Sequence, residues 1–229
     1  MPYRYKRRRY ARGRRRTFAR RKRARPVYRR YRPVQPKLMY KRLKYVQGFS
    51  LDPGTNNALS VYRFRCNSVY DPDYTGTGHQ PYGYDQITPL YSQFNVRGAM
   101  AVAKFYSGTD TQRSLPVIVG GVMDDDNTTV NATMPAILEQ SRVRWKILPA
   151  RYNGSAPKTI VLKWSDRKWF AGTDNGNHAV PVNSNPTFPA YFKFFAGMAS
   201  NTSDSNPVYC VVTIYYLVRF LEPSEVGQS

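Results

Sequence analysis

Cationic side chains at the start of the chain are the residues best placed to do chemistry. Residues 1–45 contain 21 Lys and Arg and no Asp or Glu, with runs of three Arg at residues 7–9 and 14–16. Guanidinium groups bind phosphate oxygens through paired hydrogen bonds, and a block of cations binds a polyanion by releasing its counterions. We therefore expect this segment to bind and neutralise a nucleic acid.

Aromatic and proline residues are mixed with the cations in the second half of this segment. Pro26 and Pro33 favour an extended chain, while Tyr28 and Tyr31 offer rings on which bases stack as the charges follow the phosphates. The cations expected to contact nucleic acid are Arg4, Lys6, Arg7, Arg8, Arg9, Arg12, Arg14, Arg15, Arg16, Arg20, Arg21, Lys22, Arg23, Arg25, Arg29, Arg30 and Arg32.

Charge divides the chain into two parts. The residues after 45 carry 15 Lys and Arg against 14 Asp and Glu, so they are close to neutral. A dense block of like charge repels itself and cannot bury a core. We predict that residues 1–45 form a disordered arm and that residues 46–229, which are enough for one domain of ordinary size, fold separately.

A basic row in the body is a second candidate for binding a polyanion. Arg142, Arg144 and Lys146 alternate with Val143, Trp145 and Ile147. This period of two predicts a strand with one buried and one cationic face. The cationic face is either an ordinary solvated surface or a continuation of the nucleic-acid interface, and the sequence favours neither interpretation.

Acidic clusters offer two places where a metal ion could bind. Residues 71–76 begin like a calcium loop, but position 12, which requires a bidentate Glu, is Tyr82. We interpret this segment as a turn shaped by proline and glycine. Three adjacent carboxylates, Asp124 to Asp126, repel one another, so a cation or a neighbouring Arg would relieve them; a solvated turn is the commoner interpretation. We expect neither a metal nor a cofactor.

Catalytic signatures have little support in this chain. His79 and His178 lie in expected loops, without a nucleophile or a carboxylate at motif spacing. Phosphate-binding glycine loops, zinc-ligand spacings and the Gly-x-Ser-x-Gly elbow are also missing from the sequence. We therefore expect a protein that is not an enzyme.

Strand-like segments make up most of the body. They are rich in Tyr, Phe, Val and Thr and are separated by clusters of Gly, Pro, Asn and Asp, with a short helix expected near 135–140. Long loops at 67–92, 124–134 and 166–189 are typical of binding or contact surfaces. The eight predicted strands are 43–51, 58–66, 93–105, 115–123, 142–148, 159–165, 190–197 and 208–221.

The last predicted strand is apolar on both faces. A strand of this kind is central in its sheet, and its second face must meet another layer or another subunit. Eight strands with long loops and hardly any helix predict an all-β fold, a single jelly-roll β-sandwich preceded by the disordered basic arm. Cys66 and Cys210 are expected to be buried thiols. The longest apolar run, 208–218, is too short to span a bilayer as a helix, so we expect no membrane insertion.

One segment of the body resembles a known family. Residues 64–86, FRCNSVYDPDYTGTGHQPYGYDQ, and the continuation LYSQFNVRG at 90–98 are similar to sequences in the capsid proteins of small circular single-stranded DNA viruses, the circovirus-like group. The resemblance implies a jelly roll that assembles as 60 copies into an icosahedral shell, with the arm inside on the genome. It also implies that the arm's basic clusters bind a host nuclear import receptor, that the protein occurs in the virion and the host nucleus, and that an unidentified host attachment factor binds the shell.

Three other hypotheses fit the same sequence features. A nuclear shuttle protein for nucleic acid would share the arm but form no shell. A nuclease would need a carboxylate and metal site, for which Asp124 to Asp126 is the candidate. A capsid protein of a small RNA virus or satellite would also carry such an arm, because contacts to phosphate do not distinguish DNA from RNA.

Overall fold

Two antiparallel sheets face each other in the computed structural model of this chain, which describes residues 35–54, 58–107, 115–126, 133–149, 156–171, 178–198 and 207–224. The first sheet has the order β1 (Leu38–Leu51), β9 (Val208–Pro223), β3 (Tyr91–Tyr106) and β6 (Lys158–Ser165), with the two-residue β7 (Val180–Pro181) beside β3. The second has the order β2 (Leu59–Arg65), β8 (Tyr191–Met198), β4 (Val117–Asp124) and β5 (Arg144–Leu148). The helical segments are the 3-10 turn η1 (Thr88–Leu90), α1 (Met134–Leu138) and α2 (Asp166–Trp169).

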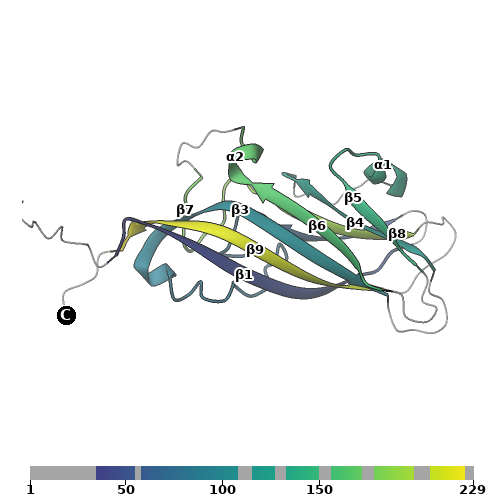
Figure 1. The fold of residues 1–229 in the computed structure, drawn as a ribbon, viewed down its shortest axis with the longest axis horizontal. Coiled ribbons are helices and arrows are strands. Elements are labelled where there is room, and N and C mark those ends of the chain that lie inside the picture. Colours follow the sequence, from purple (N-terminus) through teal and green to yellow (C-terminus); the bar gives the residue numbers. More distant parts are fainter. Residues whose placement is uncertain are drawn as a thin grey trace, which may run out of the picture. The chain divides into compact units, whose positions relative to one another are not determined.

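The strand order is that of a jelly roll. Consecutive long strands alternate between the two sheets, except for β4 and β5, which pair with each other (Figure 1). The first strand pairs antiparallel with the last, and β3 pairs on the other side of that last strand. Eight long strands wound in this way form the double-sheet jelly roll, so the predicted fold class is confirmed.

The core between the sheets is largely aromatic. Tyr45, Phe64, Phe105, Phe194 and Phe220 have no exposed surface and belong to one continuous cluster. Each such ring removes roughly 150–250 Å² from water, which makes this cluster the main source of stability. Both cysteines are buried and free, as predicted.

The central position of β9 explains its doubly apolar sequence. Val212, Ile214 and Val218 face the core without exposure, whereas Tyr209 and Tyr215 on the other side are 52% and 45% exposed. The prediction of a central strand is confirmed by its pairing with β1 and β3. Its outward face is open in this single chain.

The predicted arm boundary at residue 45 is wrong. β1 begins at Leu38, and residues 38–45 pair with residues 221–214 of β9. Leu43 and Tyr45 face the core, while Arg42 and Lys44 face outward and are exposed. A strand that covers a core on one side tolerates cations on the other, so charge density alone misplaced the boundary. All seventeen cations expected to bind nucleic acid, from Arg4 to Arg32, lie outside the described residues.

The predicted faces of β5 are also reversed. Arg144 and Lys146 pair with Gly121 and Val119, and Val119 is part of the core cluster, so the cations extend from the core side of this edge strand. Trp145 and Ile147 lie on the outward side and are 45% and 51% exposed. The cationic side chains reach solvent because β5 borders the open edge of the sandwich.

None of the helices among the described residues is long and apolar enough to cross a membrane.

Gly120 leaves room for a core ring, which gives a test of the packing. It pairs with Phe195, and a Cβ at this position would overlap the Phe195 ring and lie 2.9 Å from the Arg144 carbonyl oxygen. We expect Gly120→Ala to lower the free energy of unfolding by about 1–3 kcal/mol, measured by urea denaturation. Gly48→Ala is the control, because its Cβ would come no closer than 4.0 Å to other atoms; equal effects of both changes would contradict this packing.

Candidate nucleic-acid interface

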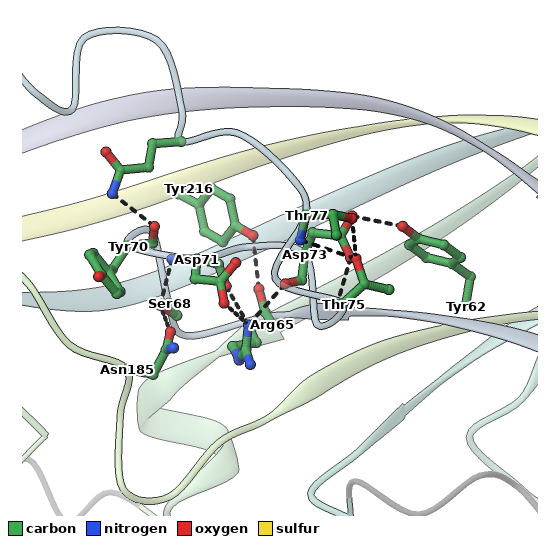
Figure 2. A network of polar contacts seen from close by, with 11 residues as sticks. Tyr62, Arg65, Ser68, Tyr70, Asp71, Asp73, Thr75, Thr77, Asn185 and Tyr216 are labelled. Carbon is green, nitrogen blue, oxygen red and sulfur yellow. Dashed lines mark hydrogen bonds and ion pairs between the residues drawn. The ribbon is translucent and has the colours of Figure 1, made fainter.

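Arg65 organises the beginning of the long loop after β2. Its Nη1 atom donates to the Asp71 carboxylate at 2.7 Å and to the carbonyl oxygens of Asp71 and Asp73 at 2.8 and 3.0 Å (Figure 2). The carbonyl oxygen of Arg65 accepts a hydrogen bond of 2.8 Å from the buried Tyr216 hydroxyl. Residues of the loop and of two strands are thereby held together, so this loop is a structured element.

Asp73 is the buried centre of the same network. It has no exposed surface, and its carboxylate accepts hydrogen bonds from the Tyr62 hydroxyl, the Thr75 hydroxyl and the Thr75 backbone N–H at 2.7, 2.9 and 3.0 Å. Burial, together with the hydrogen bond to Asp73, raises the pKa of Tyr62 to about 12. The oxygens that resembled calcium ligands are used within the protein, which agrees with the predicted turn.

The loop returns to β1 through His79. Its Nε2 atom lies 3.0 Å from the Val46 carbonyl oxygen, and its ring is 4.7 Å from the ring of Tyr45. Gly78 is in close contact, because a Cβ there would lie 2.6 Å from the Cβ of Asp73. The segment that carries the family resemblance is therefore a packed loop that follows β2 and contacts β1.

The second histidine has a carboxylate partner that the sequence analysis did not find. His178 Nδ1 lies 3.0 Å from one oxygen of Asp166, whose other oxygen accepts a 2.8 Å hydrogen bond from Arg97. Asp166 is 3% exposed and begins α2, twelve residues before the histidine. Because the aspartate also binds a guanidinium group, it sits in an ion-pair cluster that holds α2 against β3.

Asp124 is engaged by a buried lysine. Lys193 is 1% exposed, and its Nζ atom lies 2.6 Å from the Asp124 carboxylate. Desolvation acts to raise the pKa of Asp124, but the hydrogen bond and charge of Lys193, with backbone donors, outweigh it and hold the pKa below its usual value. A lysine of β8 is thus the cation that offsets the repulsion expected among the adjacent carboxylates. Among the described residues, no three metal-ligating side chains are grouped to hold an ion.

Part of the predicted basic row lines a cleft between β5 and β6. Arg142 and Arg144 lie on one side of this 640 Å³ cleft, and Lys163 of β6 lies on the other. The guanidinium group of Arg142 also stands 5.6 Å from the centre of the Trp169 ring. Lys146 is exposed but does not line the cleft. The structure therefore brings two of the three predicted residues together with a lysine that was not predicted.

The outward face of the first sheet carries a larger set of cations that sequence reasoning missed. Its strands β1, β9, β3 and β6 contain eight Lys and Arg, and Glu222 at the end of β9 is their one acid. The alternation of Arg42 and Lys44 with the apolar Leu43 and Tyr45 was a signal for this face, but it was hidden within the arm's charge. The exposed outward cations are Arg42, Lys44, Lys104 and Lys163.

Comparison with known proteins finds likenesses in structure. No protein-family model matches the chain, and no curated protein matches its sequence. Solved structures similar to it include the decameric capsid protein of BFDV, with a TM-score of 0.45 and 12% identity over 80% of this chain and 99% of that one. Another is the Macrobrachium rosenbergii nodavirus particle, with a TM-score of 0.46 and 11% identity over 83% and 97%. Cocksfoot mottle virus has a TM-score of 0.47 and 12% identity over 82% and 96%.

The Asp73 network predicts that replacing one carboxylate oxygen with an amide nitrogen strongly lowers the stability of the fold. We expect Asp73→Asn to lower the free energy of unfolding by about 1–3 kcal/mol, because an amide N–H₂ replaces a buried acceptor that faces hydroxyl and backbone donors. Thermal and urea unfolding of the full chain measure this. Asp85→Asn is the matched control, since Asp85 belongs to the same loop but is exposed; an equally large loss there would contradict the assigned role of Asp73.

Proposed function

We propose that this chain is a viral capsid protein that assembles into a small icosahedral shell and packages single-stranded nucleic acid through its basic N-terminal arm. The observation that carries the proposal is the charge partition around the jelly roll. Eighteen Lys and Arg and no acid precede β1, whereas the residues from β1 onward carry 18 Lys and Arg against 14 Asp and Glu. A jelly-roll domain with a cationic extension combines a shape that tiles a shell with a means of neutralising phosphate.

The size of the charge suits a small genome. In the smallest closed icosahedral shell, which has 60 copies, these segments would bring on the order of a thousand positive charges, enough to neutralise on the order of a thousand phosphates. The cations expected to do this are those named above from Arg4 to Arg32. Arg142 and Arg144 extend the same role to the body because they line a basic cleft with Lys163.

Exposed apolar side chains supply the contacts between copies. Tyr209 on the first sheet, and Trp145 and Ile147 on the second, are 45–52% exposed. Apolar surface of this kind on two sides of one chain is typical of proteins that associate. A structural role also fits the candidate nuclease residues, since Asp124 forms an ion pair with Lys193.

The finer identity follows the sequence resemblance. We propose that the genome is single-stranded DNA and that the virus is circovirus-like, because residues 64–86 carry that resemblance. The same proposal places the protein in the virion and in the host nucleus, with the basic clusters of residues 4–25 binding a host import receptor. A host attachment factor would bind the outer surface of the shell.

Deletion of residues 1–33 tests the packaging role. This deletion leaves β1 intact and removes 17 Lys and Arg. We expect the shortened chain to keep its β spectrum and cooperative melt, but to lose most of its affinity for single-stranded DNA and most of the salt dependence of that affinity, since counterion release goes with the cations. Fluorescence anisotropy over a range of salt concentrations measures both. Unchanged affinity would contradict packaging by the arm.

Substitution of the exposed apolar pair on β5 tests shell formation. We expect the full chain to form regular particles with single-stranded DNA in negative-stain microscopy. Trp145→Ser combined with Ile147→Ser should prevent these particles, because the outward patch would no longer exclude water between copies. The melting temperature of the dissociated chain should change little, since both side chains are about half exposed. A wild-type chain that stays monomeric with DNA would contradict the proposal.

A further inference from the structure

Two rows of residues cross the outward face of the first sheet in register. The pairing places Lys44, Tyr215, Met100 and Lys163 opposite one another on β1, β9, β3 and β6. The adjacent row consists of Arg42, Leu217, Gly98 and Ser165. Directly paired residues of antiparallel strands share a face, so both rows have a cation on β1 and apolar or small residues on β9 and β3, and the first row also ends in a cation on β6.

The two rows form a shallow groove. A 300 Å³ depression there is lined by Arg42, Gly98, Met100, Lys163 and Tyr215, among others. Gly98 has no side chain, which lowers the floor, while the exposed Tyr215 ring stands beside it. Neighbouring strands are about 4.8 Å apart, so the cations of β1 and β6 stand on opposite rims separated by roughly 14 Å.

None of the described residues that line the groove is acidic, and its rims are cationic. Arg42 lines one rim and Lys163 the other, Lys44 lies beside Arg42 on the same face of β1, and all three are exposed. The four strands contain one acid, Glu222, which lies at the end of β9 and accepts hydrogen bonds from Ser92 and Gln93. A ligand that matches this surface has negative charges along its edges and flat apolar surfaces between them.

We propose that this groove is a second nucleic-acid site, on the body of the protein, that binds an unpaired strand with one base stacked on Tyr215. The phosphates on either side of that base contact Arg42 and Lys44 on one rim and Lys163 on the other. The apolar floor of Met100 and Leu217 covers the remaining base surface. The inference rests on the proposed packaging function and adds to the arm a site for bases on the folded body.

Other occupants match the surface less well. A second copy placed with the same face against this one would bring cations against cations, because neither groove carries an acid. The protein's own arm has the same sign of charge. A double helix presents phosphates and groove edges, and its bases are already stacked on one another, so the Tyr215 ring would gain no stacking partner. An unpaired strand supplies both the charge and the exposed ring faces.

A comparison of two probes separates this site from the arm. The full chain, kept dilute, is titrated by fluorescence anisotropy with a 15-residue oligothymidylate and with an abasic deoxyribose-phosphate oligomer of the same length. Phosphate contacts of the arm contribute to both probes, whereas base stacking, by the groove and by the arm's tyrosines, contributes only to the first. We expect the wild-type chain to prefer the oligothymidylate by about tenfold, and Tyr215→Ala to reduce that preference several-fold while leaving the affinity for the abasic oligomer unchanged.

Three further variants sharpen the test. Tyr209→Ala is the matched control, a tyrosine on the same side of β9 with 52% exposure that does not line the groove, and it should keep the preference. Gly98→Leu should reduce the preference by filling the floor, since a Cβ there meets no atom closer than 3.5 Å. Lys163→Gln should weaken both probes alike. A strand carrying 4-thiothymidine should photo-crosslink to Tyr215 or to its neighbours in the groove.

The possible failures are distinguishable. Weak binding of both probes by the wild-type chain would overturn the packaging function itself. Strong binding of both, with a preference that Tyr215→Ala leaves intact, would overturn only the groove and leave the arm. Loss of particles in Tyr215→Ala, with the preference unchanged and no photo-crosslink in the groove, would assign this face to a second copy of the chain and would also overturn the proposal.

Discussion

The double pairing of β9 is the interaction on which the rest of the structure depends. It is hydrogen-bonded to β1 along one edge and to β3 along the other, with pairs that extend over nearly its whole length. Its inward side chains, among them Ile214 and Phe220, anchor the aromatic core, while its outward side chains stay exposed. Because side chains alternate along a strand, one set of backbone bonds fixes both the core and the composition of the outer face. Stability and surface chemistry are therefore coupled in the same strands.

Much of the fold could be predicted because alternation and turn residues are local signals. The jelly roll, the approximate positions of the strands and the central position of the last strand follow from alternation with a period of two and from long loops rich in Gly and Pro. The beginning of β1 could not be predicted this way, since Lys41, Arg42 and Lys44 continue the charge of the preceding residues and conceal the inward positions Leu43 and Tyr45. The faces of β5 were reversed because the sequence shows alternation but not which side meets the core. Its edge position beside β4, a tertiary property, decides that.

The candidate site was harder to predict than the fold, because it forms between strands that are distant in sequence. Arg42, Lys163 and Tyr215 come from three strands, and their separation in sequence carries no motif. The buried ion pairs could not be predicted for the same reason. Lys193 pairs with Asp124, and His178 pairs with Asp166, and secondary-structure propensities do not indicate which side chains meet in the folded chain. Polar residues in the segment 71–79 stand out first in the sequence. Their side chains form hydrogen bonds within the network around Asp73 and Arg65. They hold a loop in place and leave the exposed cations on the sheet face to act on a partner.

The near-neutral body conceals an uneven charge distribution that bears on assembly. Its described acids lie mostly in loops and at the ends of strands or helices, and two of them, Asp71 and Asp166, pair with Arg65 and Arg97. The outward face of the first sheet lacks such compensation, so copies that brought these faces toward one interior would repel one another, in addition to the repulsion between their arms. A polyanion relieves both repulsions at once. Its phosphates neutralise the cations, and the exposed rings of β9 can then be covered by bases instead of water. If the chain packages nucleic acid as proposed, the nucleic acid is a structural component of the shell, and neutralisation and closure are parts of a single process.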